Sequence, residues 1–219
     1  MMNELSTVQQ VVVLLLPVLF AITVHEAAHG WVANKLGDST AKLQGRVTLN
    51  PIKHIDPLGT VILPLGMYLL TGFMFGWAKP VPVDWRNLRN PRRDMALVAI
   101  AGPGSNLIMA IFWALGMRIG VSLMDVLPWV AYPLVYMGTA GIMINSILMI
   151  LNLLPILPLD GGRVVASLLP PRLAIPYSRL EPWGLFIIVG LLASGLLSSI
   201  IGPVLSTFQY IVVSLVGLQ

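Results

Sequence analysis

The chain has 219 residues, of which 57% are hydrophobic and only 10% are charged, and its mean hydropathy is +0.86. Ordinary soluble domains carry about 25% charged residues, so this composition excludes a soluble globular protein and indicates an integral membrane protein. The net charge of +4 could suggest a nucleic-acid partner, but membrane topology explains the positive charge better. We therefore expect a lipid bilayer, and no nucleic acid, as the surroundings of this chain.

The first element is an apolar helix that we expect from about residue 8 to residue 36, ending at the stop signal Gly37-Asp38. The string His25-Glu26-Ala27-Ala28-His29 lies inside this span, directly after an uncharged run at 11–24. On a helix, HExxH places two imidazoles on one face, where they can hold one Zn²⁺, and places the glutamate as general base toward a metal-bound water. Ionisable groups at membrane depth usually mark functional sites, so a metalloprotease is the leading interpretation.

The next segment, residues 41–50, alternates between polar and apolar or small side chains. A period of two over ten residues predicts a short strand, or a hairpin that turns at Gln44-Gly45. An exposed strand edge can pair with an extended peptide, so the segment is also a candidate substrate clamp. His54 follows in a predicted loop, where it is either a solvent-exposed histidine or a regulatory lid residue that visits the metal.

Residues 57–75 are apolar but are interrupted by prolines and glycines. If this segment re-enters the membrane and returns on the same side, every Lys and Arg except Arg118 lies on one face of the membrane. If the segment spans, that bias disappears. The positive-inside rule therefore favours a re-entrant segment, with the N-terminus outside and the C-terminus in the cytoplasm.

The later spans are expected from the remaining apolar runs, each close to the ~20 residues that a spanning helix needs. They cover residues 95–117, 133–154, 183–201 and 203–218. The expected fold class is an all-α polytopic membrane protein with about five spanning helices, a re-entrant segment, and a short strand or hairpin near 41–50. We expect a single domain over 1–219, with a motif-bearing core at about 8–170 and a C-terminal helical pair at 180–219.

A metal held by two imidazoles needs a further ligand, and the chain has no cysteine that could supply it. Apart from Glu26, only Asp160 among the nine acidic residues follows directly on an apolar run and opens a new element. At about 1.5 Å per residue, His25 lies ~15 Å below the cytoplasmic boundary and residues 101–106 lie ~12 Å below it. The candidate motifs therefore converge at one depth. The alternative role for Asp160 is a helix N-cap.

These motifs resemble those of the site-2 proteases, a family of intramembrane zinc metalloproteases. The similarity rests on HExxH, on Ala-Gly-Pro-Gly-Ser-Asn at 101–106, and on the N-x-x-P-x-x-x-x-D-G pattern at 152–161. The resemblance implies that His25, His29 and Asp160 bind one zinc ion per chain and that Glu26 is the general base. It also implies that Asn152 stabilises the oxyanion or holds substrate, in a short form of the family without PDZ or CBS domains.

The function implied by the resemblance is hydrolysis of peptide bonds within or near transmembrane segments of membrane proteins. The expected location is the plasma or inner membrane of a prokaryote, with the active site toward the cytoplasm. Asn106 is a further candidate for substrate or oxyanion contact, with an interhelical hydrogen bond as the alternative. Gly102-Pro103-Gly104 either kinks the helix and packs closely or contacts substrate.

Two other functions remain open at this point. A zinc-binding membrane transporter would show several intramembrane charges along a path and often repeated halves, and this sequence shows one cluster and no repeat. A catalytically silent relative could bind membrane helices without cutting them. The intact Glu26 argues against that relative, because a binding protein has no need for a general base.

Overall fold

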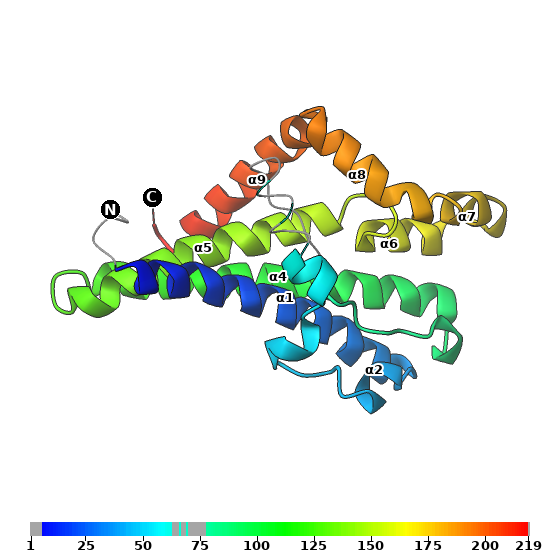
Figure 1. The fold of residues 1–219 in the computed structure, drawn as a ribbon, viewed down its shortest axis with the longest axis horizontal. Coiled ribbons are helices and arrows are strands. Elements are labelled where there is room, and N and C mark those ends of the chain that lie inside the picture. The colour runs from blue at the N-terminus through cyan, green and yellow to red at the C-terminus, as the bar shows by residue number, and fades with distance from the viewer. Residues whose placement is uncertain (1–5, 63–65, 67–68, 70–77, 219) are drawn as a thin grey trace.

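Three long helices form the centre of the molecule in the computed structural model, which describes residues 6–62, 66, 69 and 78–218 (Figure 1). These are α1 (Thr7–Leu36), α4 (Pro91–Ser122) and α5 (Pro128–Asn152), and each packs against the other two. A fourth long helix, α9 (Leu196–Leu215), packs against α5 and α4. Among the described residues, these four helices are long and apolar enough to cross a membrane. The expected helical membrane protein is thus confirmed.

The remaining described elements are short and lie mostly at the end of the bundle where α1 ends and α4 begins. They are α2 (Thr40–Leu43), a 3₁₀ turn (Pro51–His54), a π turn (Pro57–Ile62), a second 3₁₀ turn (Trp85–Asn87), α6 (Asp160–Leu168), α7 (Pro171–Ser178), a third 3₁₀ turn (Glu181–Trp183) and α8 (Gly184–Ala193).

The boundaries of α1 follow from its terminal residues. Ser6 caps the N-terminus, because its hydroxyl accepts from the Gln9 backbone N–H while the Gln9 side chain accepts from the Ser6 N–H. At the other end, Gly37 has φ +120°, a conformation that L side chains rarely adopt, and the helix stops there as predicted. A Cβ on Gly37 would also lie 2.8 Å from the Asn87 carbonyl oxygen.

Close packing between α4 and α5 depends on small residues, as is common where helices associate in lipid. A Cβ added to Gly141 would lie 2.2 Å from the indole of Trp113, and one added to Gly138 would lie 2.5 Å from the Cβ of Met117. The opposite helix faces expose large apolar side chains, among them Ile108 and Phe112 of α4. The bundle is therefore tight inside and apolar outside, as a lipid environment requires.

The prediction of a strand or hairpin at 41–50 is wrong. The segment begins with α2 and continues through a turn at Gly45, and the described residues contain no strand. The period-two pattern failed because its apolar members do not share a buried face: Ala41 is fully buried, whereas Leu43 is 85% exposed and Leu49 61% exposed. A substrate clamp built on this strand edge is not supported either.

The C-terminal pair also differs from the prediction of two spans, and four rather than five helices among the described residues could cross a membrane. The chain turns at Gly195, with φ +74°, and Pro203 lies inside α9 rather than between two helices. Arg118 near the end of α4 donates to the carbonyl oxygens of Val216 and Gly217 at 2.6 and 2.9 Å. The end of α9 therefore lies beside the α4–α5 connection, at the same end of the bundle as the start of α1 (Figure 1). The expected C-terminus at the opposite end is thus corrected.

The predicted re-entrant segment at 57–75 falls largely outside the described residues. Its first part, Pro57–Ile62, forms a π turn, and Asp56 accepts a hydrogen bond from the Gly59 N–H at 2.7 Å. Whether the segment re-enters the membrane or spans it stays a prediction.

Candidate metal centre and active site

The two histidines of HExxH lie on one face of α1, as the four-residue spacing requires. Their Nε2 atoms are 3.1 Å apart, and the rings meet edge to face with centroids 4.7 Å apart. His25 is buried within the bundle. Both imidazoles therefore present the same nitrogen to the same small volume.

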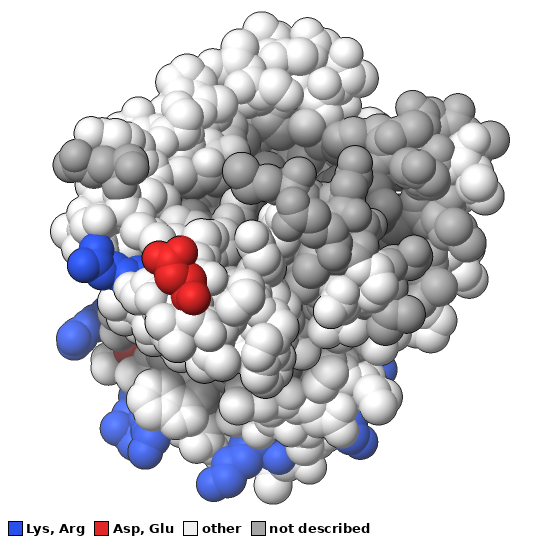
Figure 2. All heavy atoms as spheres, turned by 90° about the vertical axis from the view of Figure 1, so that its left-hand side faces the viewer, with Lys and Arg blue, Asp and Glu red and all other residues white. Residues whose placement is uncertain are grey.

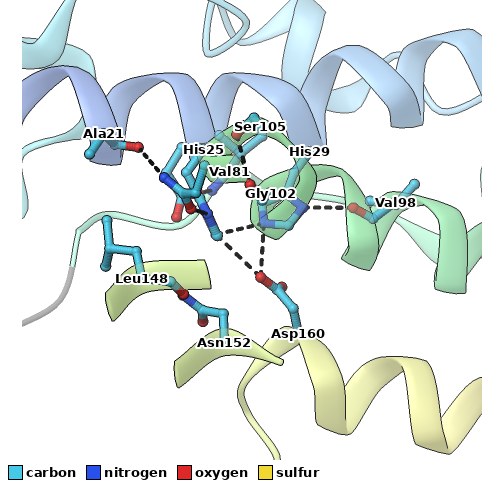
Figure 3. Close-up of polar contacts among 12 residues, drawn as sticks. Ala21, His25, His29, Val81, Val98, Gly102, Ser105, Leu148, Asn152 and Asp160 are labelled. Atoms are coloured by element: carbon cyan, nitrogen blue, oxygen red, sulfur yellow. Dashed lines mark hydrogen bonds and ion pairs between the residues drawn. The ribbon is translucent and has the colours of Figure 1, made fainter. Parts of the chain in front are cut away.

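Asp160 completes the group as the first residue of α6. Its Oδ2 atom lies 3.2 Å from His25 Nε2 and 3.4 Å from His29 Nε2, and the close-up shows the carboxylate pointing at both rings (Figure 3). The turn that brings it there depends on the two glycines that follow. A Cβ on Gly161 would lie 2.3 Å from the Leu153 carbonyl oxygen, and one on Gly162 would lie 2.5 Å from the Leu157 nitrogen.

The hydrogen bonds behind the histidines determine which nitrogens carry protons. His29 Nδ1 lies 2.7 Å from the Val98 carbonyl oxygen, which can only accept, so Nδ1 carries the hydrogen and Nε2 a lone pair. His25 Nδ1 lies 2.6 Å from Asn106 Oδ1, and the Asn106 amide nitrogen donates to the Ala21 carbonyl oxygen at 3.2 Å. Since Ala21 O can only accept, the amide oxygen must face His25, and His25 Nε2 is also bare.

When both imidazoles are neutral, their two lone pairs and a carboxylate oxygen thus face one another with no hydrogen between them. Asp160 Oδ2 is buried and has no hydrogen-bond donor. Three buried acceptors in contact are unfavourable unless a cation binds among them. All three ligand atoms lie within 4.8 Å of one another, and a His₂–carboxylate set with an open position is the donor set of catalytic zinc sites. The residues therefore fit zinc.

Gly102 of α4 packs against the imidazole rings of His25 and His29. A Cβ at this position would lie 2.4 Å from His29 Nε2 and 2.6 Å from His25 Nε2. Of the roles considered for the Gly102-Pro103-Gly104 motif, close packing therefore applies to Gly102, and its neighbours are the two imidazoles. No atom of the described residues lies within 4 Å of a Cβ on Gly104.

Glu26 points toward an extended segment that the sequence did not connect with the site. Its Oε2 atom accepts a hydrogen bond from the Val81 backbone N–H at 2.8 Å. The segment 79–84 is held by Arg46, which donates to the Lys79 carbonyl oxygen at 2.7 Å, and by the Lys79 N–H, which donates to the His54 carbonyl oxygen at 2.9 Å. We refer to residues 79–84 as the strap. Because the contact to Glu26 uses a backbone group, no side-chain pattern could have revealed it.

The remaining candidate residues lie in different surroundings. Asn106 is fully buried behind His25, with both ends of its amide engaged. Asn152 ends α5, and its side-chain nitrogen donates to the Leu148 carbonyl oxygen of the same helix at 2.9 Å (Figure 3). His54 is 2% exposed, with Nε2 3.0 Å from the Thr48 carbonyl oxygen. The expectation that His54 is a solvent-exposed loop residue is therefore wrong.

Comparison with known proteins identifies the family of the chain. The model of "Peptidase family M50", the site-2 protease family, matches residues 122–194. A protein of Bacillus subtilis (strain 168) named "Putative zinc metalloprotease YwhC" is 40% identical over 195 residues, which cover 88% of this chain and 85% of that relative. The chain belongs to peptidase family M50. This M50 member is therefore a zinc metalloprotease, and His25, His29 and Asp160 form its candidate zinc site.

Other relatives of this M50 peptidase share less of their length with it. The mycobacterial proteins named Rip2, described in the same words, are 30% identical over 176 residues in Mycolicibacterium smegmatis and 28% identical over 158 residues in Mycobacterium tuberculosis H37Rv. These regions cover 80% and 70% of this chain but 64% and 56% of the relatives, so the chain spans less than two thirds of either. No solved structure matches the chain.

Proposed function

We propose that this M50 peptidase is an intramembrane protease, in which His25, His29 and Asp160 hold one zinc ion and Glu26 is the general base. Its reaction is the hydrolysis of peptide bonds within or near transmembrane segments of other membrane proteins. The observation that carries the proposal is the meeting of three ligand atoms: one each from His25 and His29, which flank Glu26 on a helix long and apolar enough to span a membrane, and one from Asp160 of α6.

The chemistry follows from the positions of the chain's own groups. Bound zinc supplies a Lewis acid that lowers the pKa of water and polarises a carbonyl group. Glu26 takes a proton from the attacking water and later returns it to the leaving amine. The Val81 N–H occupies Glu26 Oε2, so Oε1 is the oxygen left to handle the proton. Asn106, buried behind His25, positions the ligand, and Asn152 keeps its proposed contact with substrate or oxyanion.

The depth of the site supports cleavage inside the membrane. His25 lies eleven residues before Leu36, the end of the candidate span Val11–Leu36, which corresponds to ~16 Å along a helix. The strap and the 3₁₀ turn containing His54 lie over that end of α1. His54 stays a proposed regulatory residue of the site. The substrate's helix must unwind locally, because a helical carbonyl group is already hydrogen-bonded.

Charge distribution supports a cytoplasmic site in a multi-pass prokaryotic cell membrane. Figure 2 looks onto the end of the bundle that holds the α4–α5 connection, where the few visible Lys and Arg atoms lie at the edge of the view. Arg92 and Arg93 lie at the opposite end, in the first turn of α4. By the positive-inside rule, that opposite end, which also holds the strap, faces the cytoplasm. We treat residues 1–219 as one catalytic domain with its motifs at about 8–170.

The proposal is tested with a panel of labelled single-span substrates in proteoliposomes. Glu26→Gln is expected to keep its bound zinc and to lose at least ~10²-fold in cleavage rate, because only the proton transfer is removed. The control Asp125→Asn, which alters an exposed acid in the turn between α4 and α5, should cleave as the wild type does. Equal cleavage by Glu26→Gln and wild type contradicts the proposal. Zinc transport without cleavage of any substrate favours the transporter, and neither activity favours the silent binding relative.

A further inference from the structure

Asn145 is a buried amide in the middle of α5 that no motif includes. It is fully buried, and its Oδ1 atom accepts a hydrogen bond from Asn106 Nδ2 at 2.9 Å. Its own Nδ2 donates to the Gly141 carbonyl oxygen one turn earlier at 2.8 Å. Burying an amide inside a membrane helix is costly, and these contacts satisfy both of its ends.

The direction of each hydrogen bond in this group follows from two backbone carbonyls. Gly141 O can only accept, so the Asn145 nitrogen faces it and the Asn145 oxygen faces Asn106. Asn106 then has acceptors on both sides of its nitrogen, Asn145 Oδ1 and Ala21 O, and its oxygen is left for His25 Nδ1. These hydrogen bonds link Asn145 of α5 through Asn106 of α4 to the imidazole of His25 on α1.

We propose that Asn145 is a positioning residue for the zinc ligand His25, acting through Asn106. If the Asn106 amide turned over, its nitrogen would point at His25 Nδ1, and its oxygen would face both Ala21 O and Asn145 Oδ1. The imidazole would then carry its hydrogen on Nε2, where the zinc must bind. With Asn145 present, the turned-over amide of Asn106 places its oxygen against two acceptors, Ala21 O and Asn145 Oδ1. Without Asn145, only the contact with Ala21 O disfavours that orientation of the amide. This inference rests on the proposed ligand set.

The neighbouring residue shows what a merely structural polar group looks like on this helix. Ser146 is also fully buried, but its hydroxyl donates to the Ile142 carbonyl oxygen within α5 at 2.6 Å and does not reach the zinc site. Ser146→Ala is therefore the matched control: same helix, same depth, same burial, and no link to His25.

Zinc affinity of the purified protein is the first measurement, made by chelator competition. Asn145→Leu is expected to raise the zinc Kd by up to ~10-fold, the lower end of the usual cost of removing a direct hydrogen-bond partner of a metal-binding histidine, because Asn145 acts on His25 through Asn106. Asn145→Asp keeps an acceptor oxygen toward Asn106 and should bind zinc more tightly than the leucine variant. Ser146→Ala should match the wild type. If Asn145→Leu does not fold, Asn145→Ala takes its place.

The tautomer of His25 is the second measurement and separates positioning from general loosening of the bundle. The chain contains three histidines, so ¹⁵N-histidine labelling of the zinc-free protein in nanodiscs gives a spectrum that single substitutions can assign. The wild type should show His25 protonated at Nδ1, and the leucine or alanine variant should show a mixture. Wild-type Kd and tautomer in that variant overturn the inference. Zinc binding that survives His25→Ala and Asp160→Ala overturns the proposed function instead.

Discussion

At the scale of single residues, the zinc site is defined by three acceptor atoms that cannot donate a hydrogen bond to one another. A neutral imidazole cannot place a hydrogen toward the other, because the carbonyl of Val98 and the amide of Asn106 hold the hydrogens on the Nδ1 atoms. Asp160 contributes a third acceptor. A cation is what makes this arrangement favourable, so metal binding and the packing of these side chains are one property.

Gly102 offers a direct test of that packing. Gly102→Ala is expected to abolish zinc binding, because its Cβ would lie 2.4 Å from His29 Nε2 and the rings would have to move apart. Gly104→Ala on the same helix should retain zinc, since a Cβ there has no neighbour within 4 Å. The measurement is zinc content after dialysis against a weak chelator. Equal zinc content in the two variants would show that the rings can move without loss of the site.

At the scale of elements, the strap is held in place by the buried carboxylate of Asp38. Asp38 Oδ2 accepts from the Asp84 N–H at 2.8 Å, and Oδ1 accepts from the Asn87 amide at 3.1 Å and from Thr40. Burial alone would raise the pKa of Asp38, but the hydrogen bonds from Thr40, Asn87 and Asp84 outweigh burial and hold the pKa below its ordinary value. One carboxylate thus joins the end of α1 to the start of α2 and to the strap that reaches Glu26.

Asp38→Ala should therefore loosen the strap and lower the free energy of unfolding by ~1–3 kcal/mol at neutral pH, because buried donors lose their acceptor. A depressed folded pKa means that the carboxylate stabilises the protein above its ordinary pKa of about 4 and that this contribution disappears as the pH falls further. The difference between wild type and variant should shrink below pH ~4. Thermal unfolding in detergent measures it, with the exposed Asp125→Ala as control. A difference of the same size at low and neutral pH contradicts this account.

At the scale of the whole molecule, the bundle has two unlike ends. One end holds the start of α1, the end of α9 and the α4–α5 connection, and the other holds the strap, α6 and α7 (Figure 1). Arg118, the one basic residue expected on the outer side, donates to the backbone of Val216 and Gly217. Its charge is therefore used to hold the C-terminal end of α9 against α4.

Labelling of single cysteines in intact cells tests this polarity, and the natural chain has no cysteine that would interfere. Asp125→Cys and Leu218→Cys are expected to react with a membrane-impermeant maleimide from outside, because both positions lie at the end that carries the termini. Arg89→Cys should react only after the cells are opened. Reaction of Arg89→Cys in intact cells would reverse the orientation. Protection of Leu218→Cys together with reaction of Asp125→Cys would restore the five-span topology.

The local pattern of the sequence predicted those features that depend only on helical geometry and on residues close together in the chain. The uncharged run, HExxH and Gly37 predicted α1 and its end, since helical spacing alone puts His25 and His29 on one face. The same reasoning placed α4, which is a few residues longer at both ends, and α5, which begins five residues earlier and ends two residues earlier than predicted. The isolated position of Asp160 after an apolar run singled it out as a candidate ligand, and the structure brings it to both histidines.

The local sequence pattern did not predict the structure of segments whose conformation depends on contacts with distant parts of the chain. Residues 41–50 alternate like a strand, but the described part of the chain holds no strand for them to pair with, and Asp38 instead accepts from the first residue of α2. Pro203 looked like a boundary, yet the bundle places the turn at Gly195.

The sequence by itself determined a strongly apolar chain with two histidines on one face of a helix, and it made a membrane-embedded zinc metalloprotease the leading interpretation, because composition and a four-residue spacing act within a single segment. Only the tertiary structure decided that Asn106 faces His25, that Asn145 stands behind it and that the Val81 N–H reaches Glu26. Such hydrogen bonds join atoms that are far apart along the chain, and their directions depend on backbone carbonyls, which are the same in every residue type.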